Sequence, residues 1–308
     1  MNIAVIDLGT NTFNLLIAEV NGLEYQPKFA TKEFVQLGKG GINNKLIQED
    51  AFIRGLSTLG RFKTIAEEHN CSEIICVATS AIRNAKNGFK FAGQVEKDLG
   101  LKLQIIDGNK EAELIYLGAK QAVHIDNGYS LIMDVGGGST EFIICNAKEI
   151  FWKQSFEVGV ARLFERFHHS DPITTDEIMA IEQYLQSILE PLTAYAASHK
   201  FEKLIGCSGA FSSFAAIILN QEDNEDEIAA PHNYRFNHAD FSKTHQLLMT
   251  SKVTERLQIK GLVKQRAPMI VVGSILVNYV LNTLNINHFE MSKYALKEGV
   301  IADFIKNK

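Results

Sequence analysis

Two short acidic, glycine-containing segments carry the residue types that bind phosphate and divalent cations. One contains Asp7 followed by residues 9–12, and the other contains Asp134 followed by residues 136–140. In each segment an apolar run ends at an Asp-x-Gly turn with small hydroxyl residues, and a second apolar run follows. Backbone N–H groups of such turns form anion-binding concavities, and glycine lets the backbone approach an oxyanion closely. One copy could be an ordinary hairpin with a capping aspartate, but two copies favour a pair of loops that grip one phosphate chain.

The two turns define a set of candidate binding residues. Hydroxyl groups of the turn residues add hydrogen-bond donors, and a carboxylate at a strand end can hold a divalent cation directly or through water. The set expected to bind phosphate is Asp7, Gly9, Thr10, Asn11, Thr12, Gly136, Gly137, Gly138 and Ser139. The second turn is not a P-loop, because no Gly-Lys-Ser/Thr follows it and the next element reads as a strand.

The composition excludes several classes of protein. The chain has 308 residues, of which 46% are hydrophobic and 22% charged, so a globular protein with a sizeable core is expected. A formal net charge of −5 argues against a general nucleic-acid coat. No apolar run reaches the roughly 18 residues needed to span a bilayer. The four cysteines lack zinc-site spacing and no leader pattern precedes the first strand, so free thiols and a cytoplasmic location are expected.

The elements that must position these residues alternate between strands and helices in both halves. Apolar periodicity predicts an α/β fold with two similar domains, residues 1–126 and 127–293, around a ligand cleft. A last helix at about residues 294–308 is expected to cross back onto the first domain. The pattern also predicts one long helix from Thr174 through Leu192, opened by a capping box with Glu177, and another from Lys264 to Leu284.

These motifs resemble those of a known family. Residues 6–12 and 134–141 resemble the two phosphate loops of the exopolyphosphatase/guanosine pentaphosphate phosphohydrolase (Ppx/GppA phosphatase) family. Further stretches at residues 79–85, 108–112, 206–210 and 295–299 resemble family segments in the same order. The resemblance covers essentially the whole chain and implies two actin-like (ribonuclease H-like) domains, as in acetate and sugar kinases and chaperone ATPases. Because the chain ends about where the two-domain core ends, it resembles the short form, which implies short substrates.

The resemblance also implies roles for individual residues. Glu111 would be the general base that deprotonates the attacking water, although the residues alone would favour a helix-start carboxylate. Arg83 would bind phosphate, where the residues alone leave a surface arginine equally open. The metal ligands would be Asp134 and Glu141, with Asp7 as a third, and Mg²⁺ is the expected ion, with Mn²⁺ as an alternative. Ser208 and Gly209 would complete the phosphate site.

Three positions depart from the usual family pattern. Lys110 stands where the family often has glutamate, Ala210 where it has threonine, and Lys297 where it has arginine. These departures concern the substrate more than the reaction.

The expected activity is Mg²⁺-dependent removal of the terminal phosphate from short polyphosphate, guanosine pentaphosphate or both. Two alternatives are a small-molecule kinase of the same superfamily and a non-catalytic sensor of alarmones or polyphosphate. The presence of Glu111 speaks against the sensor. The expected partners are these phosphate substrates, without nucleic acid or membrane, and a homodimer is left open.

Overall fold

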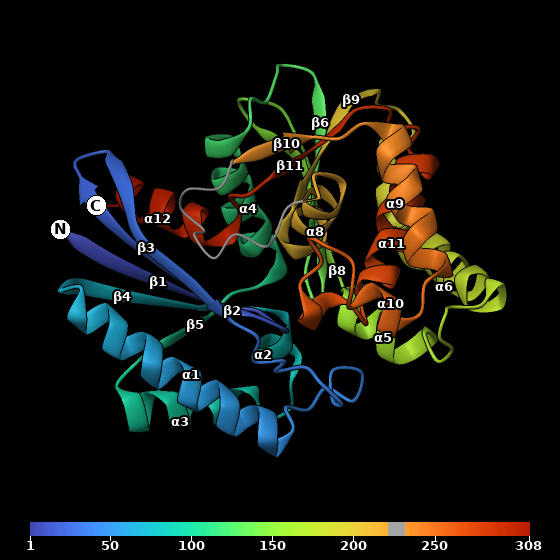
Figure 1. The fold of residues 1–308 in the computed structure, drawn as a ribbon. Helices are drawn as coiled ribbons and strands as arrows, with labels where there is room; N and C mark the ends of the chain where they lie inside the picture. Colours follow the sequence, from blue (N-terminus) through green and yellow to red (C-terminus); the bar gives the residue numbers. More distant parts are fainter. Residues whose placement is uncertain (221–231) are drawn as a thin grey trace. The chain divides into compact units, whose positions relative to one another are not determined.

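The structure, a computed structural model, describes residues 1–220 and 232–308. These residues divide into two compact units (Figure 1). The first unit contains residues 1–118 and 295–308, and the second contains residues 119–220 and 232–294. The boundary between the units therefore lies inside helix α4 (Gly108–Ala122).

The first unit is built on a mixed sheet of five strands. Their order is β3-β2-β1-β4-β5, with β1 antiparallel to β2 and parallel to β4. The strands are β1 (Asn2–Leu8), β2 (Phe13–Asn21), β3 (Glu24–Glu33), β4 (Cys71–Ala78) and β5 (Leu103–Ile105). The carboxyl ends of the parallel strands β1, β4 and β5 meet at one edge, which is where ligands bind in open α/β sheets.

The second unit repeats this arrangement with one added strand. Its order is β8-β7-β6-β9-β11-β10, and β6 is again antiparallel to the next strand of the chain and parallel to the strand after the crossover. The strands are β6 (Tyr129–Val135), β7 (Thr140–Cys145), β8 (Ile150–Phe156), β9 (Phe201–Cys207), β10 (Asn233–Arg235) and β11 (Phe289–Ser292). The two units thus share a topology, which confirms the α/β class and the internal similarity predicted from the sequence.

The central strands explain why the sequence repeats continuous apolar runs. Residues Ile3–Ile6 of β1 and Leu131–Met133 of β6 are fully buried. Strands buried on both faces carry apolar residues at successive positions rather than in alternation. Burial of these runs fixes the two strands at the middle of their sheets, so the turn that follows each one lies at the sheet edge.

Helices cover both sheets. In the first unit α1 and α3 pack together on one face of the sheet, and α12 contacts β1 and β2 (Figure 1). In the second unit α11 contacts α5, α6, α8 and α9 around a large apolar core. The remaining helices are α1 (Glu49–Glu68), α2 (Ser80–Asn84), α3 (Gly88–Leu99), α5 (Val160–Phe167), α6 (Thr175–Ile188), α7 (Glu190–Ala196), α8 (Ser208–Ile218), α9 (His238–Thr250), α10 (Val253–Arg256), the 3₁₀ turn η1 (Lys264–Arg266), α11 (Ile270–Thr283) and α12 (Leu296–Lys306).

Two predicted long helices are wrong, and proline explains both. The helix expected from Thr174 through Leu192 is divided into α6 and α7, with Pro191 in the first turn of α7. The helix expected from Lys264 to Leu284 begins as a 3₁₀ turn and becomes α11 only after Pro268. Proline lacks an N–H and its ring collides with the preceding turn, so it begins helices rather than continuing them. The predicted capping box of Thr174 and Glu177 is present.

The last helix packs closely on α4 within the first unit. A Cβ atom at Gly299 would lie 1.8 Å from the Leu114 carbonyl oxygen, and one at Gly118 would lie 1.8 Å from the Ala295 carbonyl oxygen. Lys110 and Asp303 form a 3.0 Å ion pair between the same two helices. The close approach holds α4, which carries Glu111 in its first turn, against the rest of the first unit.

Candidate active site

The turn after β1 is a closed loop whose first residue, Gly9, has little room for a side chain. The Gly9 N–H donates to the Thr12 carbonyl at 3.1 Å, and a Cβ on Gly9 would lie 2.8 Å from that oxygen. Two carbonyls of the loop accept hydrogen bonds from the segment before α1. Gly38 donates to the Thr10 carbonyl at 3.1 Å, and Gln36 donates to the Asn11 carbonyl at 2.9 Å.

These bonds set the direction of the loop's N–H groups. In a planar trans peptide the carbonyl and the next N–H point in opposite directions. Because the carbonyls of Thr10 and Asn11 point toward the segment at residues 36–38, the N–H groups of Asn11 and Thr12 point away from it. Successive N–H groups on one side of a loop form an anion-binding concavity. Two successive N–H groups of this turn therefore point away from the supporting segment, and phosphate binding by residues 9–12 stays a prediction.

The turn after β6 has the same closure. Gly136 donates to the Ser139 carbonyl at 3.0 Å, and a Cβ on Gly136 would lie 2.8 Å from that oxygen. Here the supporting element is the start of α5. The N–H groups of Val160 and Ala161 donate to the carbonyls of Gly136 and Gly137 at 3.0 and 2.8 Å. The first N–H groups of a helix have no partner within the helix, so α5 and the loop satisfy one another.

The aspartate before each loop faces a different cross-strand partner. Asp7 pairs in register with Asn14, whose Nδ2 donates to Asp7 Oδ2 at 2.9 Å. Asp134 pairs in register with Glu141, and both residues are buried. Ser155 Oγ donates to Glu141 Oε1 at 2.6 Å. Two carboxylates on directly opposed positions repel one another, so a divalent cation between them would be favourable.

Glu111 and Arg83 meet at the carboxyl edge of the first sheet. Arg83 Nη1 donates to Glu111 Oε2 at 2.7 Å and to the Ile106 carbonyl at 3.1 Å. Glu111 is 6% exposed. Arg83 comes from α2, directly after β4, and Glu111 comes from the first turn of α4, after β5. The structure thus brings together the two residues that were predicted to be catalytic.

Asp107 positions the start of α4. Its Oδ1 accepts the N–H groups of Asn109 and Lys110, both at 2.9 Å, and its carbonyl accepts the Glu111 N–H at 3.0 Å. A carboxylate that accepts N–H groups of the first helical turn stabilises that turn. Asp107 therefore fixes the backbone that carries Glu111.

Ser208 and Gly209 lie at the start of α8, directly after β9. Ser208 has a φ of 69°, a left-handed conformation that is costly for residues other than glycine. The Gly209 carbonyl accepts hydrogen bonds from Arg266 Nη1 and Ser213 Oγ, both at 2.9 Å. Since β9 is parallel to β6, this turn and the loop after Asp134 lie at the same edge of the second sheet.

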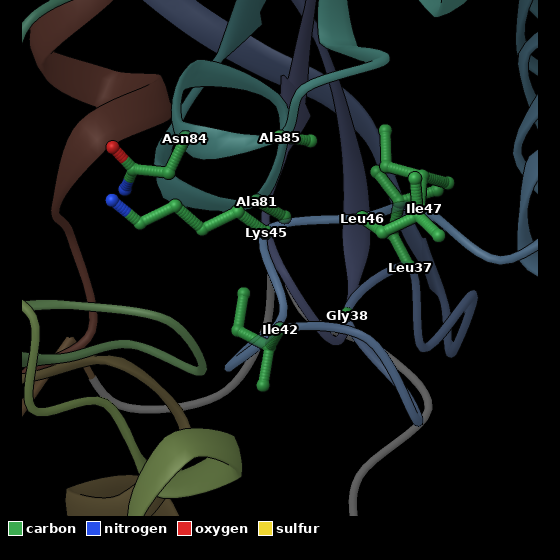
Figure 2. A pocket seen from close by; sticks show the side chains of 9 residues that line it. All are labelled: Leu37, Gly38, Ile42, Lys45, Leu46, Ile47, Ala81, Asn84 and Ala85. Atoms are coloured by element: carbon green, nitrogen blue, oxygen red, sulfur yellow. The ribbon is translucent and has the colours of Figure 1, made fainter.

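A small, mostly apolar pocket lies beside the first loop's supporting segment (Figure 2). The side chains of Lys45 and Asn84 point toward one another there, and the Lys86 N–H donates to the Lys45 carbonyl at 2.8 Å. The pocket therefore lies between two elements. One is the segment whose Gly38 binds the Thr10 carbonyl, and the other is α2, the helix that carries Arg83. Its lining residues are Leu37, Gly38, Ile42, Lys45, Leu46, Ile47, Ala81, Asn84 and Ala85.

The predicted site residues form two groups, one in each unit. The first unit holds Asp7, residues 9–12, Arg83 and Glu111, and the second holds Asp134, residues 136–139, Glu141, and Ser208 with Gly209. Within residues 1–220 and 232–308, no three His, Cys, Asp or Glu side chains gather closely enough to hold a metal ion. The cleft between domains and the three-carboxylate metal site stay predictions.

Sequence reasoning did not single out Arg162 or Arg266. Arg162 contacts the second phosphate loop and Arg266 contacts Gly209. A Gly-Val-Ala-Arg run after β8 was the available signal for Arg162, since a glycine before a helix often marks close packing. For Arg266 the sequence offers no local signal.

Comparison with known proteins identifies the family. The model of the Ppx/GppA phosphatase family matches residues 16–308. The chain belongs to this family. Membership supports a phosphatase activity, as the resemblance of the two loops predicted.

Individual relatives agree with this assignment. The chain is 28% identical over 306 residues to exopolyphosphatase 1 of Mycobacterium bovis, an alignment that covers 98% of this chain and 87% of the relative. The crystal structure of an exopolyphosphatase from Cytophaga hutchinsonii is 38% identical, has a TM-score of 0.94, and covers 100% of this chain and 98% of that one. The Aquifex aeolicus Ppx/GppA enzyme shares the fold, with a TM-score of 0.82 at 24% identity, over 98% of this chain and 99% of that one.

Two further expectations concern thiols and membranes. All four cysteines are free, and burial raises the pKa of the Cys76 and Cys145 thiols to about 12. Such thiols stay protonated and unreactive at neutral pH. Among the helices of residues 1–220 and 232–308, none combines the length and the apolar character that crossing a bilayer requires.

Proposed function

We propose that this phosphatase hydrolyses the terminal phosphoanhydride bond of polyphosphate, of guanosine pentaphosphate or of both, and releases orthophosphate. The observation that carries the proposal is the ion pair between the partly exposed Arg83 and the buried Glu111, which lies at the same sheet edge as the first phosphate loop. Phosphoryl transfer to water needs a phosphate cradle, charge neutralisation and a positioned base. The first unit contains residues suited to each of these three tasks.

Glu111 would act as the general base and Arg83 as the phosphate ligand. In the structure Arg83 Nη1 donates a hydrogen bond to Glu111 Oε2 at 2.7 Å. A terminal phosphate that binds Arg83 would compete with Glu111 for the guanidinium, because phosphate oxygens accept the same forked donors. The Glu111 carboxylate would then accept the proton of a water molecule aligned with the scissile bond. Substrate binding would in this way break the hydrogen bond between Arg83 and Glu111 and leave the carboxylate able to accept a proton.

The second unit contains residues that fit a divalent cation. Asp134 and Glu141 present hard carboxylate oxygens from directly opposed strand positions, which suits Mg²⁺ or Mn²⁺, and Asp7 stays the predicted third ligand. Bound Mg²⁺ would neutralise charge on the phosphate oxygens. The backbone N–H groups of both loops would hold the phosphates themselves.

Phosphate release by the purified protein tests the proposal. Short and long polyphosphate, guanosine pentaphosphate, and ATP with and without glucose or acetate would each be offered with Mg²⁺, and again after removal of the metal with EDTA. Wild-type protein should release orthophosphate from polyphosphate or guanosine pentaphosphate. Glu111→Gln should lower the rate by roughly 10²- to 10⁴-fold, the usual contribution of a general base, with binding retained.

A matched control variant separates the role of Glu111 from a general effect on α4. Glu113→Gln makes the same chemical change two residues along the same helix and should leave the rate near that of the wild type. Tight binding without release from any substrate would contradict hydrolysis and favour a sensor. Transfer from ATP to glucose or acetate would instead identify a kinase.

The remaining expectations stay predictions. The comparison of short with long polyphosphate measures the chain-length preference, and light scattering measures the oligomeric state. A cytoplasmic location would be checked by fractionation of cells that express the protein.

A further inference from the structure

The second phosphate loop has three consecutive carbonyls tied to the start of α5. The backbone N–H groups of Val160 and Ala161 donate to the first two, the carbonyls of Gly136 and Gly137. The third, that of Gly138, accepts a hydrogen bond from Arg162 Nε at 2.7 Å. By the geometry of the trans peptide, the N–H groups of Gly137, Gly138 and Ser139 therefore all point away from α5.

This arrangement makes a concavity with three aligned donors. Neither Gly137 nor Gly138 donates its N–H to another group among the described residues. Successive N–H groups on one side of a loop attract an anion with several oxygens, such as a phosphate. Two of the three donors are directed by backbone contacts that most residues could make. The third donor, the Ser139 N–H, depends on one side chain.

The surroundings of Arg162 hold its guanidinium in place. Its side chain is only 10% exposed, and its Nη2 forms an ion pair with Glu157. A buried, doubly held guanidinium behind the Gly138 carbonyl also polarises the Gly138–Ser139 peptide. Polarisation along a hydrogen-bonded chain makes the N–H at the other end a stronger donor.

We infer that Arg162 is a positioning residue that directs and strengthens the Ser139 N–H toward the phosphate of the substrate. The inference rests on the proposed function insofar as the ligand is a phosphate chain. Arg162 does not touch the substrate; it acts through the peptide between Gly138 and Ser139. Its effect should therefore be confined to the third donor of the loop.

The test combines nuclear magnetic resonance with kinetics. Orthophosphate is titrated into ¹⁵N-labelled protein while the amide signals of Gly137, Gly138 and Ser139 are followed. In the wild type all three should shift. In Arg162→Met, which keeps an apolar stem of similar length, the Ser139 shift should shrink while that of Gly137 persists, and phosphate affinity should fall roughly 10- to 100-fold, as for one charge-assisted hydrogen bond.

Two further variants serve as a control and as a conservative substitution. Arg166→Met is the matched control, since Arg166 lies on the same helix but stacks over Phe167 and Tyr184. Arg162→Lys keeps the buried charge without the planar fork and should recover part of the affinity. If Arg162→Met binds phosphate like Arg166→Met, or loses all three amide shifts together with its thermal stability, the inference is wrong. If Arg162→Met does not fold, Arg162→Lys decides, because unchanged affinity and an unchanged Ser139 shift in that variant would overturn it.

These readouts are independent of turnover. Failure of the proposed function would appear as absence of orthophosphate release by the wild type. Failure of this inference would appear as equal amide shifts in Arg162→Met and in the control. Where turnover is measured, Arg162→Met weakens an N–H that binds the phosphate in both ground and transition states, so it should raise KM more than it lowers kcat.

Discussion

The two hairpins that follow β1 and β6 share a backbone but differ in the partners around it. Each closes with a glycine N–H on the carbonyl three residues ahead, at 3.1 Å in the first unit and 3.0 Å in the second. Across the strand, Asp7 meets an amide in Asn14 whereas Asp134 meets a carboxylate in Glu141. The two units thus repeat the same closed turn, while a single cross-strand residue distinguishes a hairpin with one carboxylate from a hairpin with two.

The supports of the two loops differ as well. The first loop is held by a turn-forming segment at residues 36–38, in which Gln36 has a φ of 50°. The second is held by a helix start and a buried arginine. Both supports act on loop carbonyls, so the same direction of N–H groups has been reached by two unrelated means.

The largest expected effect tests the carboxylate pair of the second hairpin. Glu141→Gln removes one of the two charges that face each other and should lower Mg²⁺ affinity by at least about 100-fold, the upper range seen for loss of an outer-shell partner. Isothermal titration with Mg²⁺ or Mn²⁺ measures it. The control is Glu149→Gln, the same change at an exposed residue of the second unit. Equal affinity in the two variants would remove the proposed distinction between the hairpins.

The next prediction compares one glycine from each of the two elements that support the loops, Gly159 before α5 and Gly38 in the segment at residues 36–38. A Cβ at Gly159 would lie 2.3 Å from the Gly137 carbonyl carbon, whereas one at Gly38 would meet the end of the Thr10 side chain at 2.6 Å. Backbone cannot move aside as a side chain can. Gly159→Ala should therefore lower the free energy of unfolding by about 3 kcal/mol and Gly38→Ala by about 1 kcal/mol, the two ends of the usual cost of overpacking.

Urea denaturation would compare these two variants with a third. Gly93→Ala changes a glycine inside α3 that has open space around it, and it should raise stability by roughly 0.5–1 kcal/mol. A larger loss for Gly38→Ala than for Gly159→Ala would mean that the first support is the more rigid one.

The smallest effect concerns pH and the far end of α5. His168 follows this helix, is buried, and its Nδ1 has no hydrogen-bond partner among the described residues. Burial lowers its pKa below the ordinary 6.5, and Arg256 lowers it further, against smaller opposing effects of Glu177 and Asp171. The unfolded chain therefore binds the proton more tightly than the folded protein does.

The sign of the pH effect follows from this difference. The contribution of neutral His168 to stability is complete above the unfolded pKa of about 6.5 and is lost as the pH falls below it toward the folded pKa. Thermal unfolding between pH 8 and pH 5, roughly spanning that value, should show a weaker pH dependence in His168→Gln than in the wild type. His169→Gln, a change at the exposed neighbour, should keep the wild-type dependence. A wild-type slope in both variants would show that α5 does not sense pH through His168.

Local sequence by itself determined much of the fold. Continuous apolar runs specified the buried strands, the Asp-x-Gly turns marked both hairpins, and the pair Thr174 and Glu177 marked the start of α6. These features depend on hydrogen bonds and burial within a few residues, so neighbours in the chain suffice to specify them. The predictions of two long helices were wrong because Pro191 and Pro268 interrupt an apolar pattern of helical period that otherwise continues.

Only the tertiary structure decided which distant groups meet. Arg83 and Glu111 are 28 residues apart and form an ion pair because parallel strands bring their carboxyl ends to one edge. Arg162 reaches Gly138 across 24 residues because β8 delivers the start of α5 beside the turn after β6. Such contacts arise from sheet order and helix packing, which no local pattern encodes. The sequence therefore specified the two closed turns and the charged residues beside them, and the packing of distant segments decided which side chains contact one another there.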